Sequence, residues 1–389
     1  MPIDVPERGH LTLIFKPIYA CNLACAYCYN EGWRDTRSDR MSLEEAKYAF
    51  SWVNDFCRMR GVESVKVIWH GGEPLLMGPS FLHEVIGFYQ KLFSESGIAV
   101  KNVIQTNATL INEDHIEIFR DFFNSSIGFS FDYKSGCRCF PDGRDASDMI
   151  LERALWTKAQ GVKVGAIMVC CKQNIGKMDD LFSFMAEKDI AFKFSRPFLP
   201  YNPSEQASAC IQSVTDSEYV ECVCRLVDIA LRQKRARLAR LCTTVQDYIA
   251  AFLLNKISIC AQRGTCSMSH LSIGPHGDIY PCGRFSNNIF RVGNYLSDRP
   301  KDVIPNLIEL CHNYEGEDVN CRRCQFNEFC KGGCTFLRVT GCHDAECWVN
   351  RSIWEYISSK MSEIGLARGS LAGCVKEDVA EMVHRAMAR

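Results

Sequence analysis

The cysteines of this chain gather in two segments, and their distribution restricts the possible folds more than any other feature. Of the 23 cysteines, three lie in the segment CNLACAYC and ten lie between Cys260 and Cys347. Such densities are typical of small disulfide scaffolds that cannot form a core, or of metal sites. The chain has 389 residues, 47% of them apolar, so it can bury a core over two or three domains without disulfides.

The other sequence features agree with a reduced protein that uses thiolates as metal ligands. The N-terminal segment MPIDVPERGH has neither the basic nor the apolar region of a signal peptide, which predicts a cytoplasmic protein. No uncharged apolar run approaches the roughly 18 residues of a membrane span, so we expect no membrane partner. The net charge of −1, from 45 basic and 46 acidic residues, argues against nucleic acid as a partner.

The N-terminal segment supplies three cysteines, Cys21, Cys25 and Cys28, and the next cysteine is Cys57. Three thiolates leave one metal position open to another molecule, in contrast to closed four-ligand structural sites. The spacing, with Tyr27 directly before the last cysteine, resembles the signature of the radical SAM superfamily. That resemblance implies a 4Fe–4S cluster held by these three cysteines, with S-adenosylmethionine (SAM) bound to the fourth iron.

The first half of the chain alternates between strand and helix patterns. A helix over 41–61 begins at a capping box of Ser42 with Glu45 and ends at Gly61. Six strand–helix units in succession predict a parallel α/β sheet, and the resemblance implies a partial (β/α)6 TIM-like radical SAM barrel. The expected strands cover 11–18, 65–69, 100–106, 127–131, 162–170 and 192–195, and the further helices cover 80–94, 146–160, 178–188 and a segment from about 113.

Residues at the carboxyl ends of these strands are candidate ligand contacts, because parallel α/β folds bind ligands there. The segments HGGEP and QTNATL resemble superfamily motifs that face SAM, although Ala108 replaces a glycine of related enzymes. An arginine in the loop after the fourth strand would pair with the SAM carboxylate, and Arg144 and Arg138 are both candidates. The resemblance implies SAM contacts from Tyr27, Gly71, Gly72, Glu73, Gln105, Asn107, Ser130, Asp132, Arg144 and Val169.

The second group of cysteines resembles the SPASM domain, a small cysteine-rich extension that binds two auxiliary 4Fe–4S clusters. Carried over by position, the resemblance implies one set of Cys260, Cys266, Cys282 and Cys334, and a second set of Cys321, Cys324, Cys330 and Cys347. Cys342 is the alternative to Cys347, and two four-cysteine zinc sites are the alternative to clusters.

These assignments divide the chain into four expected regions. They are a radical SAM core (1–200), a helical connector (201–256), a SPASM domain (257–350) and a C-terminal helical segment (351–389). The cofactors implied by the resemblance are three 4Fe–4S clusters and SAM.

The resemblance implies an oxidoreductase that makes a 5′-deoxyadenosyl radical from SAM and takes hydrogen from a carbon atom. Many SPASM enzymes modify peptides, and we favour one that forms a carbon–carbon or thioether cross-link in a ribosomally made precursor peptide. Anaerobic sulfatase maturases carry an aspartate where this chain has Gly283, which disfavours formylglycine formation. A dehydrogenase or epimerase of a small molecule or peptide is a further alternative.

Two other classes remain open at this point: an electron carrier with three clusters, and a non-catalytic binding protein. Further partners that we expect are a flavodoxin- or ferredoxin-type electron donor and a separate leader-binding protein. The candidates for catalytic or substrate contacts are Tyr280, Arg284, Cys137 and Cys139.

Overall fold

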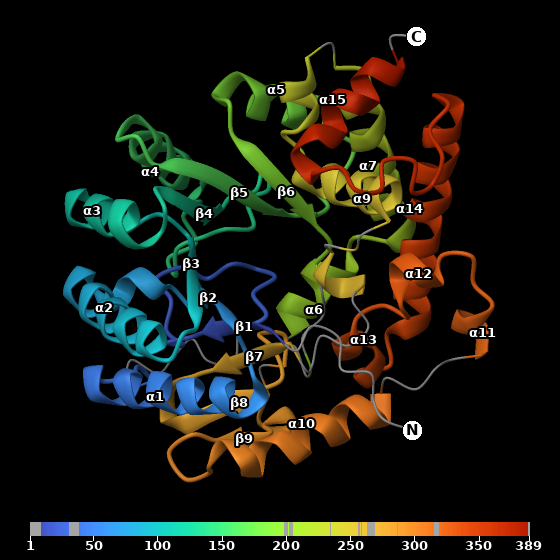
Figure 1. The fold of residues 1–389 in the computed structure, drawn as a ribbon. Helices are drawn as coiled ribbons and strands as arrows, with labels where there is room; N and C mark the ends of the chain where they lie inside the picture. Colours follow the sequence, from blue (N-terminus) through green and yellow to red (C-terminus); the bar gives the residue numbers. More distant parts are fainter. Residues whose placement is uncertain are drawn as a thin grey trace.

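The computed structural model describes residues 9–30, 39–197, 201, 205–233, 235–255, 257, 259–262, 269–285, 287–314 and 319–387. Of residues 206, 311–314, 319, 320, 343 and 377 it describes the backbone alone. Over these ranges the chain forms a nine-stranded sheet flanked by helices (Figure 1).

Six parallel strands form the first part of this sheet, as the alternating pattern predicts. They are β1 (His10–Phe15), β2 (Ser64–Trp69), β3 (Ala99–Thr106), β4 (Ser126–Ser130), β5 (Lys163–Val169) and β6 (Ala191–Ser195). Each pairs with the preceding strand in sequence, in the order β6-β5-β4-β3-β2-β1. β1 ends earlier than predicted because Pro17 has no N–H to continue the ladder.

Five helices connect these strands and cover the outer face of the sheet (Figure 1). They are α1 (Leu43–Arg60), α2 (Pro79–Glu95), α3 (Glu113–Phe122), α4 (Ser147–Ala159) and α5 (Met178–Lys188). The predicted helix ends are confirmed, since Ser42 Oγ accepts from Glu45 N at 3.0 Å and Gly61 ends the helix with φ 64°. The Glu45 side chain does not complete the predicted capping box, because its Oε1 accepts from His276 N and the Tyr295 hydroxyl. Phe50 of α1 stacks on Tyr89 of α2, with ring centroids 4.0 Å apart, and both are fully buried.

The cysteine-rich region continues the same sheet. β7 (His270–Ile273) pairs in parallel with β1, and β8 (Asp278–Tyr280) and β9 (Gly293–Asn294) follow in antiparallel pairing. The strands on either side of the expected boundary at 257 are therefore hydrogen bonded to each other.

Helices make up most of the remaining chain. α6 (Glu205–Gln212), α7 (Asp216–Leu231), α8 (Ala236–Ala239) and α9 (Thr243–Leu254) follow β6, and α10 (Pro300–Tyr314), α11 (Val319–Arg322), α12 (Asn327–Cys330), α13 (Thr335–Val339), α14 (His343–Glu363) and α15 (Lys376–Met387) follow β9. Trp354 of α14 stacks on Phe329 of α12, with ring centroids 4.7 Å apart, and meets Tyr248 of α9 edge-on. These contacts join the C-terminal helices to the connector.

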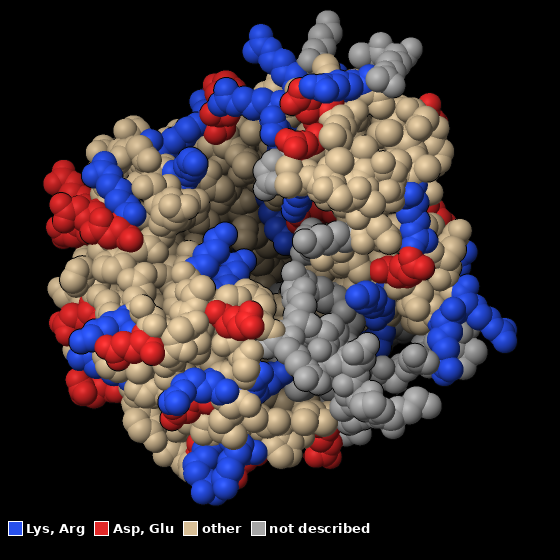
Figure 2. Space-filling model, in the orientation of Figure 1, with Lys and Arg blue, Asp and Glu red and all other residues tan. Residues whose placement is uncertain are grey.

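The surface carries both signs of charge. Basic and acidic side chains are interspersed over the face drawn in Figure 2, which is hollowed at its centre. In the part of the chain that the structure describes, no helix is long and apolar enough to cross a bilayer.

Two glycines after β2 hold the segment that leads into the first cysteines. Gly72 N donates to Ile18 O at 2.9 Å, and Glu73 N donates to Ala20 O at 3.0 Å. A Cβ on Gly71, whose φ is 130°, would lie 2.3 Å from Ile18 O, and one on Gly72 would lie 2.0 Å from Ala20 O. These glycines therefore give space to the backbone of residues 18–20, and their contact with SAM stays a prediction.

We therefore expect Gly72→Ala to reduce the free energy of unfolding by roughly 1–3 kcal/mol, the usual cost of overpacking. The matched control is Gly87→Ala in α2, where a Cβ would meet nothing within 4 Å, and where alanine stabilises a helix by about 1 kcal/mol. Urea unfolding measures both variants. Equal midpoints for Gly72→Ala and the unmodified protein would show that residues 18–20 are not held in this way.

Candidate active site

The first three cysteines lie in the loop after β1 with their thiols half-buried. Asn107 Nδ2 approaches Cys21 Sγ at 3.8 Å, and an Arg138 Nη1 donor approaches Cys25 Sγ at 3.9 Å. Burial raises the pKa of Cys21 to about 12, so the thiol form dominates until a metal ion replaces the proton. The amide and the guanidinium donate toward sulfur, as groups around a thiolate-bound cluster do.

The loop after β4 supports these cysteines through its backbone. Ala24 N donates to Cys139 O at 2.7 Å, and Ala26 N donates to Cys137 O at 2.9 Å. The Cys139 thiol contacts Gly136 O at 3.3 Å. The two cysteines that we considered as catalytic candidates thus hold the loop with their carbonyl groups.

A buried carboxylate joins this loop to two strands. Asp132, fully inaccessible to solvent, accepts from the hydroxyl of Tyr27 and from Val169 N at 2.7 Å. Arg138 Nε lies 2.8 Å from Asp132 Oδ2, and the guanidinium covers the Tyr27 ring at 5.4 Å. Burial opposes the charge of Arg138, but Asp132 and its neighbours outweigh burial and raise its pKa. The structure therefore brings together Tyr27, Asp132 and Val169, three of the expected SAM contacts.

The arginine at this site is Arg138, the alternative candidate. Arg144, the residue that we preferred, has an exposed side chain with Nε 2.7 Å from Asp142 Oδ2. A tight turn causes this difference, because Phe140 N donates to Arg144 O at 2.8 Å and directs the Arg144 side chain to solvent.

Glu73 lies beneath the cysteine loop and connects β2 to β3. Its oxygens accept from Asn107 N and Thr106 Oγ1, both at 2.6 Å, and from Leu75 N at 3.0 Å. Burial raises the pKa of Glu73 to about 7, and the three hydrogen bonds oppose that rise. The next pair of strands is joined in a similar way, since Gln105 Nε2 donates to Ser130 Oγ at 2.9 Å.

Three cysteines of the first auxiliary set surround one arginine. Arg284, half-buried in this set, donates from Nη1 to Cys334 Sγ at 3.5 Å, and the thiols of Cys260 and Cys282 are also near its charge. Burial raises the pKa of Cys282 to about 12. Cys266, expected as the fourth ligand, lies outside the described residues.

In the second auxiliary set, burial raises the pKa of Cys330 to about 12, and the thiols of Cys347, Cys321 and Cys324 lie near enough to act on it electrostatically. Cys342 lies elsewhere, with its thiol 3.8 Å from Thr340 O. Cys347 is thus among the neighbours of Cys330, and its choice over Cys342 as a ligand stays a prediction.

The structure adds Lys16, which the sequence analysis overlooked. Lys16 is 3% exposed, and its Nζ donates to Asn30 Oδ1 and to Gly283 O, both at 3.1 Å. Burial lowers its pKa to about 8, although thiolate charge at nearby Cys282 and Cys28 acts in the opposite direction. One buried ammonium group therefore joins the first cysteine loop to the first auxiliary set. The sequence feature that could have identified Lys16 is a lysine inside an apolar segment expected to be a strand.

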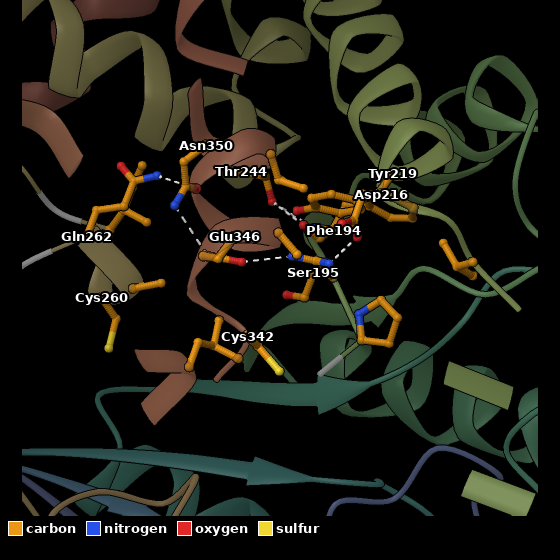
Figure 3. A pocket seen from close by; sticks show the side chains of 18 of the residues that line it. Phe194, Ser195, Asp216, Tyr219, Thr244, Cys260, Gln262, Cys342, Glu346 and Asn350 are labelled. Atoms are coloured by element: carbon orange, nitrogen blue, oxygen red, sulfur yellow. Dashed lines mark hydrogen bonds and ion pairs between the residues drawn. The ribbon is translucent and has the colours of Figure 1, made fainter. Parts of the chain in front are cut away.

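A cavity of about 670 Å³ adjoins the first auxiliary set (Figure 3). Its wall contains Arg284 and Cys260, residues at the end of β6, and residues of α7, α9 and α14. Arg196 Nη1 lies 2.9 Å from Glu346 Oε2 and also pairs with Asp216. The sequence could not reveal this cavity, because its wall comes from segments far apart along the chain.

Tyr280 takes no part in this cavity. Its buried hydroxyl lies 3.0 Å from Asn288 Oδ1 and 3.2 Å from Asp278 Oδ2, at the antiparallel edge of the sheet. Of our candidates for substrate contact, Arg284 is therefore the one in the cavity wall.

The donor set of the first loop suits an iron–sulfur cluster. Among the described residues, no three His, Cys, Asp or Glu side chains converge closely enough to hold a single metal ion. A four-iron cube needs thiolates that stand further apart than the ligands of one ion. The first loop offers three half-buried thiols and two donors that face sulfur, and this arrangement fits a cluster with one open iron.

Comparison with known proteins agrees with this chemistry. Residues 15–185 match the model of the radical SAM superfamily. A cysteine-type anaerobic sulfatase-maturating enzyme from Clostridium novyi is 25% identical over 344 residues, which cover 83% of this chain and 87% of the relative. A serine-type enzyme from Bacteroides thetaiotaomicron is 25% identical over 386 residues, which cover 89% and 87%.

Two solved structures share the fold. The anSMEcpe structure with bound AdoMet and Cp18Cys peptide superposes with a TM-score of 0.75 at 21% identity, covering 92% of this chain and 99% of that chain. Streptococcus suis SuiB, bound to precursor peptide SuiA, gives 0.58 at 20% identity, covering 85% and 73%. Residues 15–185 therefore match the radical SAM superfamily, and the chain is similar over most of its length to anaerobic sulfatase-maturating enzymes.

Proposed function

We propose that the protein is a radical SAM/SPASM maturase that forms an oxidative cross-link, carbon–carbon or thioether, in a ribosomally made peptide. The observation that carries this proposal is the cavity of about 670 Å³, whose wall is shared by the end of β6 and the first auxiliary set. That volume is in the range of pockets that enclose small ligands or side chains. Two proteins of similar fold have been solved with bound peptides: anSMEcpe with the Cp18Cys peptide and SuiB with the precursor peptide SuiA.

The proposed cofactors are SAM and three 4Fe–4S clusters, which supply one-electron chemistry and a radical that removes hydrogen from carbon. Cys21, Cys25 and Cys28 would hold the cluster to which SAM binds. The two auxiliary sets, with Cys266 as the fourth ligand of the first, would hold the others. A flavodoxin- or ferredoxin-type donor and a separate leader-binding protein are the proposed partners.

The chain's own residues position this chemistry and exclude water. Glu73, Asn107 and Asp132 are fixed by hydrogen bonds before any ligand arrives, so they present a preorganised surface at the strand ends. Arg138 places positive charge beside Cys25, and Lys16 does so between the first loop and Gly283. Arg284 has the corresponding place beside Cys334, at the cavity wall.

Formylglycine formation in a sulfatase is the second candidate, because the homologous enzymes carry that name. Against it, the related maturases have an aspartate base where this chain has Gly283. Gly283 has no side chain, so this position offers no carboxylate, and its carbonyl group accepts from Lys16.

The test is an anaerobic reaction of the reconstituted enzyme with SAM, a reductant and two peptide sets. One set contains the short precursor peptides encoded beside this gene, and the other contains sulfatase-derived peptides with a cysteine or serine at the modified position. We expect a precursor peptide to lose a pair of hydrogen atoms, and fragmentation in tandem mass spectrometry to locate a bond between two of its residues.

Other products would contradict the proposal. An aldehyde on a sulfatase peptide would establish the second candidate. Uptake of one deuterium from solvent in exchange for one hydrogen, with no oxidation of the peptide, would indicate epimerisation. SAM that stays intact under reduction would indicate an electron carrier or a non-catalytic protein.

The buried ion pair gives a prediction on stability. Asp132→Asn leaves the Arg138 guanidinium buried without its counter-charge, and loss of one partner of a buried pair costs roughly 3–5 kcal/mol. We expect a decrease of that size in the free energy of unfolding, measured with urea on the metal-free chain. Asp142→Asn is the control, because Asp142 pairs with Arg144 in solvent, and its effect should be far smaller. Equal effects of the two substitutions would contradict the assigned role of Asp132.

A further inference from the structure

Lys16, directly after β1, is a buried cation whose partners are neutral groups. It is 3% exposed, and its Nζ donates to Asn30 Oδ1 and to Gly283 O, both at 3.1 Å. The ammonium group also lies 5.2 Å from the centroid of the Tyr29 ring. None of these partners in the described part of the chain is a carboxylate. A charge removed from water is costly unless an opposite charge accompanies it, so negative charge from another source is expected beside Lys16.

The other cation beside the first cysteine loop differs from Lys16 in this respect. Arg138 Nε lies 2.8 Å from Asp132 Oδ2, so the fold itself supplies the counter-charge of this guanidinium. Arg138 and Asp132 together therefore add no net charge at the loop. Lys16, in contrast, contributes a net positive charge there.

The partners of Lys16 belong to the two segments that supply the expected cluster ligands. Gly283 directly follows Cys282 of the first auxiliary set, and Asn30 lies two residues after Cys28 of the first loop. Consecutive Cα atoms are about 3.8 Å apart, so the two hydrogen bonds hold the ammonium group close to both ligand positions. The thiols of Cys282 and Cys28 are also near enough to act on its charge electrostatically. Thiolates at these positions would supply the negative charge that Lys16 otherwise lacks.

We infer that Lys16 is a positioning residue for electron transfer, whose buried ammonium group raises the reduction potentials of both the cluster of the first loop and the cluster of the first auxiliary set. This inference rests on the cofactors of the proposed function. A thiolate-held cluster gains one negative charge when it accepts an electron from a flavodoxin- or ferredoxin-type donor, and no bond forms or breaks. A fixed positive charge nearby stabilises that reduced state relative to the oxidised state.

The place of Lys16 between the two sites has a further consequence. One charge that acts on both clusters shifts both reduction potentials in the same direction. The difference between the two potentials, which sets the direction of electron transfer between the clusters, therefore changes less than either potential does. Removal of the charge should make both clusters harder to reduce.

The test is a redox titration of the full-length, cluster-reconstituted protein under anaerobic conditions at neutral pH. Titanium(III) citrate is the reductant, and electron paramagnetic resonance is the readout. The signal that changes on addition of SAM reports the cluster of the first loop, and the remaining signals report the auxiliary clusters. Lys16→Met removes the charge at nearly constant side-chain length, Lys16→Gln removes it but keeps a hydrogen-bond donor, and Lys16→Arg keeps the charge.

We expect the potentials of the first-loop cluster and of one auxiliary cluster to fall in Lys16→Met and Lys16→Gln. At a fixed potential the ratio of reduced to oxidised cluster should be lower by about tenfold or more, and a tenfold change is about 59 mV for one electron. The third cluster should be unchanged, and Lys16→Arg should bring both potentials back toward those of the unmodified protein. Lys91→Gln is the control, because Lys91 is exposed on α2, where solvent and salt screen its charge.

Three results would overturn the inference: unchanged potentials in iron-replete Lys16→Met and Lys16→Gln, equal shifts in Lys16→Arg, or equal shifts in Lys91→Gln. Loss of iron from all three Lys16 variants would also overturn it, since it would assign Lys16 a structural role. Loss of iron from the two uncharged variants alone would support it, because even the oxidised clusters would then require the charge.

The titration also separates this inference from the proposed reaction, because it needs no peptide. Absence of a cross-linked product would contradict the proposed reaction alone, and unchanged potentials in iron-replete variants would contradict this inference alone. An unmodified chain that binds no cluster would contradict both.

Discussion

The buried carboxylate of Asp132 is the interaction on which the arrangement of the site depends. It accepts from Tyr27 in the cysteine loop and from Val169 in β5, and it pairs with Arg138. A carboxylate removed from water is tolerated only when donors surround it, so these three groups are bound to fixed positions. The Arg138 guanidinium also approaches Cys25 Sγ. The buried ion pair therefore fixes the cysteine loop against β5 and places positive charge beside this thiol.

The two cysteine regions form one structure. β7 pairs with β1, and Lys16 at the end of β1 donates to both Asn30 and Gly283. Sheet hydrogen bonds and a buried ammonium group therefore set the position of the first auxiliary set relative to the first loop. The cavity lies beside this junction.

Local patterns predicted much of the fold, because the six strands and the helix over 41–61 depend on periodicity and capping. The cysteine sets came from a family resemblance, and the structure places Cys347 among the neighbours of Cys330. Side-chain direction could not be predicted in this way. The turn that directs Arg144 to solvent and the backbone contact that requires Gly72 both depend on tertiary structure.

The most direct test of the account compares the unmodified protein with Cys21→Ala/Cys25→Ala/Cys28→Ala after anaerobic reconstitution, by iron analysis and by 5′-deoxyadenosine release from SAM. Three four-iron clusters predict about 12 iron per unmodified chain and about 8 in the variant. The unmodified protein should release 5′-deoxyadenosine and the variant should release none. Near 4 iron in the unmodified chain, zinc in place of iron, or release that persists in the variant would contradict the account.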